Sequence, residues 1–248
     1  MPSKNITIDI KPREIISAYK QAPFDIGKEA LESQGYHIIS LEENANLRIQ
    51  ESQDSYVSRN GNYTKEGVLY LPGKGRFLTR NSPIMANPRE ATQAHRERKE
   101  YYLTNEQVEQ SLQGSIPIKQ GSIPTNRFKD EEITVYAFGK SAEEYGSFLG
   151  EGEDGIQEMP ISLANLEKKP FARQMWFWDL DNRSELDGYF GFLSGGGWVR
   201  GIQNSAKGAQ KNIEDFLLLN VLTEEEINDP RLLRDALRFY KNNIGFLK

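Results

Sequence analysis

The sequence predicts an α+β fold, in which helices cover a mainly antiparallel, aromatic-rich sheet. Strand-like and helix-like segments follow one another in mixed order, without the regular βαβ alternation of a doubly wound parallel sheet. A glycine-tipped hairpin is expected within 67–80. The aromatic-rich segment 171–203 is expected to supply three antiparallel strands over 174–203, joined by two turns.

A glycine-, serine- and proline-rich segment leaves open a division of this fold into two lobes. Gly-Ser-Ile-Pro occurs at 114–117 and again at 121–124, a composition typical of a connector. The predicted organisation is therefore an N-terminal α+β lobe at 1–113, a connector at 114–127, and a C-terminal α+β lobe at 128–248.

Local signals place the elements of the N-terminal half. Residues 6–10 alternate as a strand does, Pro12 can open a helix, and helices are also expected at 25–31, 88–102 and 104–112. Ser40 and Glu43 have the spacing of a capping box before a helix that includes Leu41 and Ile49. The hairpin has strands at 67–71 and 76–80.

The C-terminal half begins with an apolar run at 133–138, which predicts a buried strand. Ser141 and Glu144 have capping-box spacing before a short helix that ends near 149. After the aromatic segment, apolar residues spaced along 232–244 predict an amphipathic helix.

Composition excludes several classes of site. The 248 residues contain no cysteine and only two histidines, His37 and His95, which excludes thiolate metal sites and cysteine nucleophiles. No apolar run reaches the roughly eighteen residues of a membrane span, and the first residues have no apolar signal segment, so a cytoplasmic protein without membrane association is expected.

One basic band interrupts an otherwise acidic chain. Residues 59–99 contain 9 Lys+Arg against 3 Asp+Glu, whereas the whole chain has a net charge of -5. Such a band is typical of an anion-binding surface, for nucleic acid or an acidic protein, or of a helix face exposed to solvent. The acidic loop 150–155 is an alternative partner within the protein. The candidate anion-binding residues are Lys74, Arg76, Arg80, His95, Arg96 and Lys99.

The aromatic segment supplies two further candidate sites. Trp176, Trp178 and Trp198 are expected in the core or on a sheet face. The alternative is an aromatic recognition surface with Arg173, Arg183 and Arg200 near it. Asp179 and Asp181 follow an apolar strand and would lie on the same side of it, which suits one Mg²⁺ or Mn²⁺ ion for phosphoryl transfer or hydrolysis. Glu185 or Asp187 would assist.

The carboxylate pair resembles the first motif of haloacid-dehalogenase-like phosphatases, D-x-D-x-[TV]. Arg183 stands at the Thr/Val position, and too little chain follows for the remaining parallel strands. Membership of that family is therefore not inferred. The sequence favours a non-catalytic binding protein that needs no cofactor. A carboxylate–metal enzyme is the alternative, and a homo-oligomer assembled through the aromatic surface is a third hypothesis.

Overall fold

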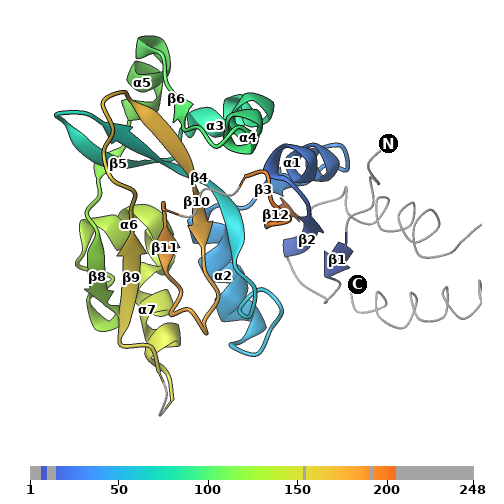
Figure 1. The fold of residues 1–248 in the computed structure, drawn as a ribbon. Helices are drawn as coiled ribbons and strands as arrows, with labels where there is room; N and C mark the ends of the chain where they lie inside the picture. The colour runs from blue at the N-terminus through green and yellow to red at the C-terminus, as the bar shows by residue number, and fades with distance from the viewer. Residues whose placement is uncertain (1–6, 10–14, 153–154, 190–192, 205–248) are drawn as a thin grey trace, which may run out of the picture.

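The computed structural model describes residues 7–9, 15–152, 155–189 and 193–204. Within these residues all the strands belong to one twelve-stranded sheet (Figure 1). The strands are β1 (Thr7–Asp9), β2 (Ile15–Gln21), β3 (His37–Ile38), β4 (Asn62–Leu71), β5 (Gly75–Thr79), β6 (Tyr101–Tyr102), β7 (Ile116–Pro117), β8 (Gly121–Pro124), β9 (Glu158–Ser162), β10 (Phe171–Phe177), β11 (Leu186–Asp187) and β12 (Trp198–Asn204). The main path is β1-β2-β12-β4-β10-β11-β9-β8.

Helices cover both faces of the middle of the sheet. The helices are α1 (Phe24–Glu32), α2 (Leu41–Glu51), α3 (Pro83–Ala86), α4 (Pro88–Arg96), α5 (Asn105–Leu112), α6 (Glu132–Phe138) and α7 (Ala142–Gly150), with 3-10 turns η1 (Thr125–Arg127) and η2 (Gly139–Ser141). One buried cluster contains side chains of α2, α6 and α7, and a second contains side chains of α1, α3 and α4. Figure 1 shows α6 and α7 beside β8 and β9, and α1 beside β2, β3 and β12.

Strands β4 and β10 separate these two clusters. Their side chains alternate, so Val68 and Phe177 enter the cluster under α2, whereas Leu69 and Trp176 enter the cluster under α1. Burial of each such side chain stabilises the fold by about 1.5–3 kcal/mol relative to exposure. The two strands therefore form the central layer of the molecule, against which both core clusters pack.

Several predicted elements are confirmed. Strand β1, helices α1, α2 and α5, and the β4–β5 hairpin lie where the sequence predicts them, and α4 occupies the first part of the helix predicted at 88–102. The capping box of α2 is formed: Ser40 Oγ accepts from the Glu43 amide at 3.1 Å, and the Glu43 carboxylate accepts from the Ser40 amide at 2.7 Å. These elements depend on signals within a few residues, which explains their agreement.

Two local predictions are wrong. The run 133–138, predicted as a strand, lies in α6, because Thr134, Ala137 and Phe138 repeat with helical spacing on its buried side. The helix predicted from Pro12 is replaced over Ile15–Gln21 by β2, which pairs with β12 along all seven of its residues. In both places a tertiary contact overrides the local preference.

The predicted fold class is also wrong, because the sheet is mixed and strands from both halves of the chain share it. Strand β10 pairs antiparallel with β11, whereas β12 pairs antiparallel with β2 and parallel with β4. Strand β11 is parallel to β9. Most of the second strand predicted for the 174–203 meander, at 189–193, lies outside the described residues, and the third strand, β12, is held beside α1. The carbonyl of Gly197 accepts from the Ala22 amide at 3.1 Å, and Val199 packs directly on Gly27.

The predicted connector contributes to the same sheet. Strand β7 pairs with β5, strand β8 pairs with β9, and η1 follows at once. The sheet thus crosses 114–127, and a division of the chain there into domains stays a prediction. The amphipathic helix predicted at 232–244 lies outside the described residues. Over the part of the chain that the structure describes, no helix has the length and apolar character required to cross a bilayer.

Candidate functional site

A cleft of about 510 Å³ lies between the end of α4, strand β10 and the chain that follows β11. Its position depends on three segments that are far apart in the sequence. Strand β6 brings the chain after α4 against β10, with Tyr101 opposite Ala172. The lining residues are Ala91, His95, Arg98, Lys99, Glu100, Tyr101, Ala172, Arg173, Gln174, Tyr189 and Leu193.

The end of α4 places two cations at this cleft. The amide of Arg98 donates to the His95 carbonyl, and the amide of Lys99 donates to the Ala94 carbonyl, both at 2.9 Å. This is the hydrogen-bond pattern of a Schellman motif, whose turning residue is usually glycine. Here the turning residue is Arg98, with φ at 57°, and its side chain is exposed.

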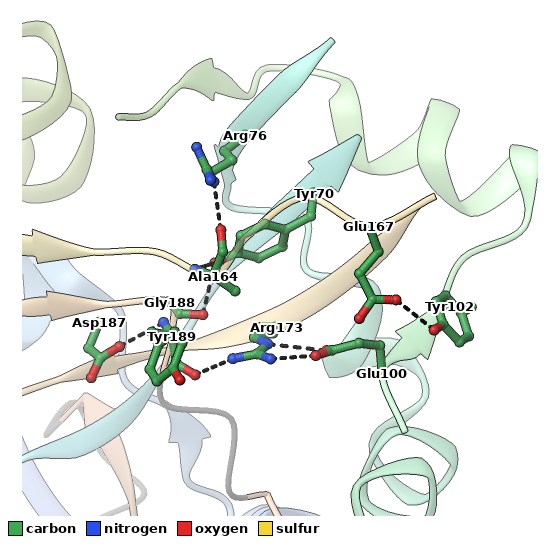
Figure 2. A network of polar contacts seen from close by, with 10 residues as sticks. All are labelled: Tyr70, Arg76, Glu100, Tyr102, Ala164, Glu167, Arg173, Asp187, Gly188 and Tyr189. Atoms are coloured by element: carbon green, nitrogen blue, oxygen red, sulfur yellow. Dashed lines mark hydrogen bonds and ion pairs between the residues drawn. The ribbon is translucent and has the colours of Figure 1, made fainter. Parts of the chain in front are cut away.

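An ion pair forms one wall of the cleft. The Arg173 guanidinium donates to both oxygens of Glu100, and the Nε–Oε2 distance is 3.1 Å (Figure 2). Arg173 also donates from Nη1 to the carbonyl of Tyr189. Both partners of the ion pair are mostly buried, with about one fifth of each side chain exposed. The pair therefore ties β10 to the chain before β6 and to the chain after β11.

Asp187 stabilises the same wall of the cleft through hydrogen bonds to Tyr189 and Trp178. Its Oδ1 accepts from the Tyr189 amide at 2.7 Å, and its Oδ2 accepts from Trp178 Nε1 at 2.9 Å. Only 6% of Asp187 is exposed. A chain of polar contacts thus runs from Trp178 through Asp187, Tyr189 and Arg173 to Glu100.

His95 contacts the opposite wall of the cleft. Its Nδ1 lies 3.1 Å from Ser194 Oγ, which links α4 to the chain that precedes β12. Burial lowers the pKa of His95, and the nearby Arg173 guanidinium lowers it further, against the opposing effect of Glu100. Near neutral pH the imidazole is therefore mainly uncharged, so the permanent positive charges of the cleft come from its arginines and lysine.

The six predicted anion-binding residues do not form one cluster. His95 and Lys99 line the cleft, and Arg96 lies 3.7 Å from Asp25 of α1. The other three belong to the β4–β5 hairpin, which projects away from α4 in Figure 1. Lys74 occupies its tip, Arg76 Nε donates to the Ala164 carbonyl at 2.8 Å, and Arg80 donates to the Tyr136 carbonyl at 2.6 Å.

The three tryptophans pack against the core cluster under α1. Trp176 is only 5% exposed and packs edge to face with Tyr63, at a centroid distance of 4.8 Å. Trp178 packs edge to face with Trp176, at 5.7 Å. Trp198 contacts Tyr19 and Tyr56 instead. The described side chains thus place these rings mainly in packing contacts.

The predicted carboxylates are also dispersed. Asp179 accepts from the amide and the side chain of Asn182, both at 2.9 Å, which caps a tight turn. Asp181 is exposed beside a second, smaller cavity of about 210 Å³. Burial raises the pKa of Glu185, and both oxygens of Asp187 already accept hydrogen bonds. Among the described residues, no three histidine or acidic side chains are grouped as metal ligands.

Two residues of the cleft, Arg98 and Tyr189, were absent from the predicted sites, and Arg173 was expected only near the aromatic recognition surface. Arg98 lies within the basic band, but no local signal marks an arginine that ends a helix in a left-handed conformation. Arg173 and Tyr189 lie in the aromatic segment, and their pairing with Glu100 and Asp187 depends on β6 and β11. Only the segment as a whole, with its concentration of aromatic and charged residues, indicated a site.

Comparisons with known proteins identify the fold. No protein-family model matches the chain, and no curated protein matches it. One similar solved structure matches this chain with a TM-score of 0.55. It is described as showing the accommodation of massive sequence variation in Nanoarchaeota by the C-type lectin fold. The two chains are 18% identical, and the match covers 78% of this chain and 99% of the other. The likeness corrects the predicted fold class: the mixed sheet and its helices have the C-type lectin fold.

Proposed function

We propose that this chain is a binding protein whose cleft accepts an anionic group beside Arg98 and Lys99. The observation that carries the proposal is the conformation of Arg98. An arginine stands where the backbone of a helix end favours glycine, and its side chain lines the cleft. A left-handed conformation costs a residue other than glycine about 1 kcal/mol. Strain of this kind is often retained where the side chain has a role in binding.

The charges of the cleft support the same proposal. Arg173 is neutralised by Glu100, and Lys99 pairs with Glu97 at 2.9 Å on the surface. Arg98 forms no ion pair within the described residues. An entering anion therefore meets one uncompensated guanidinium and one ammonium whose exposed ion pair is weak. Within the predicted basic band 59–99, the proposed anion contacts are therefore the last two residues, Arg98 and Lys99.

The similar structure fits a binding role. The C-type lectin fold of that protein accommodates massive sequence variation in Nanoarchaeota. A backbone that tolerates variation of its surface residues can present different binding surfaces on one core, and the function then resides in the surface residues. For this chain, the cleft residues would provide that surface.

The experiment is a thermal-shift titration at low salt with citrate, inorganic pyrophosphate and dodecathymidylate. At least one of these anions is expected to raise the Tm of the wild-type protein, since a ligand that binds only the folded state stabilises it. Arg98→Gly and Lys99→Gln should reduce the shift, and added salt should reduce it in the wild type.

Lys119→Gln is the matched control, because Lys119 is an exposed lysine outside the cleft. Its response to the anions should equal that of the wild type. The proposal fails if none of the three anions raises the Tm, or if Lys119→Gln reduces the shift as much as Arg98→Gly does.

A further inference from the structure

We propose that the partner of this cleft is an acidic segment of another protein, with Tyr189 as the aromatic contact and Arg98 as the carboxylate contact. This inference rests on the proposed function and adds the class of partner. It begins from an unusual combination at Tyr189, whose exposed fraction is 62%. The side chain is open to solvent, although the amide and the carbonyl of Tyr189 both form hydrogen bonds.

Two charged groups fix the Tyr189 backbone. Its amide donates to Asp187 Oδ1 at 2.7 Å, and its carbonyl accepts from Arg173 Nη1 (Figure 2). Each fixing group has a further partner, since Asp187 accepts from Trp178 and Arg173 is paired with Glu100. Hydrogen bonds to charged groups are stronger than those between neutral groups. The position from which the ring projects is thus set before any partner arrives.

The ring itself lies near the Arg173 guanidinium, with 5.5 Å between the Arg173 Cζ atom and the ring centroid. A tyrosine has few rotatable bonds, so a contact on a preorganised ring loses little conformational entropy. Tyrosine and arginine are enriched among the residues that contribute most to protein–protein affinity. An exposed tyrosine with a fixed backbone, lining the same cleft as the uncompensated Arg98, therefore fits a protein surface.

A second exposed apolar contact continues this surface. Tyr102 is 44% exposed, and in Figure 2 it lies on the side of the Arg173–Glu100 pair opposite Tyr189. Its hydroxyl donates to Glu167 at 2.7 Å, which holds the ring in place. The nearby Leu166 is 40% exposed. Tyr102 does not line the cleft itself and extends the exposed surface beyond the Arg173–Glu100 pair.

Nucleic acid suits this arrangement less well. A phosphate backbone requires cations along a track, whereas Arg76 and Arg80 donate to carbonyls of their own chain and Arg96 faces Asp25. An acidic segment with apolar residues matches both the local cations and the exposed rings.

The test is an NMR titration of the full-length ¹⁵N-labelled chain with a blocked peptide, acetyl-Glu-Glu-Leu-Leu-Glu-Glu-amide, at millimolar concentration. Replacing its glutamates with glutamine, or its leucines with serine, should each weaken binding about tenfold. Arg98→Gly and Tyr189→Ala should each weaken it to a similar extent. Tyr189→Phe should keep the wild-type affinity, because it keeps the ring, and Lys119→Gln serves as the unchanged control.

The outcomes separate this inference from the proposed function. Two results would overturn the acidic-segment inference and leave the anion site standing. In the first, the peptide binds Tyr189→Ala as well as it binds the wild type. In the second, the peptide does not bind the wild type, whereas dodecathymidylate or pyrophosphate binds through Arg98. If no peptide and no anion binds, both are overturned. If the Tm of Tyr189→Ala is close to that of the wild type, the variant is folded, and its weaker binding results from loss of the ring.

Discussion

Glu66 is a carboxyl group buried in β4, with its Oε2 3.0 Å from the Leu41 amide at the start of α2. Burial raises its pKa from 4.5 to about 7, although the hydrogen bond to Leu41 acts in the opposite direction. Between these pH values the folded protein keeps a proton that the unfolded chain releases. Raising the pH from 4.5 to 7 should therefore lower the free energy of unfolding, by up to about 3 kcal/mol.

Glu66→Gln should remove this part of the pH dependence, because the amide cannot ionise and still offers an oxygen to Leu41. The measurement is urea unfolding at several pH values between 4 and 8 for both proteins. Glu109→Gln, at an exposed position in α5, is the control and should keep the wild-type slope. A parallel pH dependence of wild type and Glu66→Gln would contradict the prediction.

Arg98 gives a second prediction for a single residue. Glycine adopts the left-handed backbone without strain, so Arg98→Gly should raise the free energy of unfolding by about 0.5–1 kcal/mol, even though it weakens anion binding. Denaturant unfolding measures the gain. Glu97→Gly is the matched control, because Glu97 has an ordinary φ of -84° and glycine there should lower stability. A loss of stability in Arg98→Gly would show that no strain is present.

At the scale of an element, the two predicted capping boxes behave differently. Ser40 precedes α2 with ψ at 169° and forms its box, whereas Ser141 precedes α7 with ψ at 1° and forms none. The chain enters α7 directly from the 3-10 turn η2, so Ser141 lacks the extended backbone that a capping residue needs. Ser141 Oγ donates to Asn46 at 2.5 Å instead.

Ser40→Ala should therefore lower the free energy of unfolding by about 1–2 kcal/mol, because it removes a cap that is 95% buried. Thr104 caps α5 in the same way but at an exposed position, so Thr104→Ala should cost less, about 0.5–1 kcal/mol. Urea denaturation of the two variants measures the difference. Equal losses, or a larger loss for Thr104→Ala, would contradict the link between burial and capping strength.

At the scale of the whole molecule, the contact between α1 and β12 determines how the end of the described chain closes the sheet. A Cβ atom on Gly27 would lie 2.5 Å from Val199 Cγ2, so only glycine permits this approach. Gly27→Ala should lower the free energy of unfolding by about 1–3 kcal/mol, although alanine normally stabilises a helix.

Val199→Ala in the same chain removes Cγ2 but leaves Cβ at 2.8 Å, so it should relieve part of the clash. The double variant should then lose less than the sum of the single losses. Gly150→Ala is the control. Gly150 also lies in a helix, but its nearest neighbour is Thr125 Oγ1 at an ordinary 3.7 Å. Thermal or urea unfolding checks all four variants. Additive losses at Gly27 and Val199 would show that α1 and β12 do not pack as described.

The features that depend on neighbours within about four residues could be predicted from the sequence alone. The Ser40 and Thr104 helix starts, the hairpin around Gly73, and the basic end of α4 all follow from such short-range chemistry. Two of the predicted anion-binding residues, His95 and Lys99, line the candidate cleft.

Strand pairing and side-chain contacts between distant segments could be seen only in the three-dimensional structure. Strand β12 lies beside β2 and β4 rather than β11, and the cleft joins Arg98, Arg173 and Tyr189 from three separate segments. Hydrogen bonds such as those between β2 and β12 join segments at opposite ends of the described chain, and the buried face of α6 packs against α2, which lies far from it in the sequence. Local periodicity contains no information about such partners, because the same alternating strand can pair with any edge that buries its apolar side.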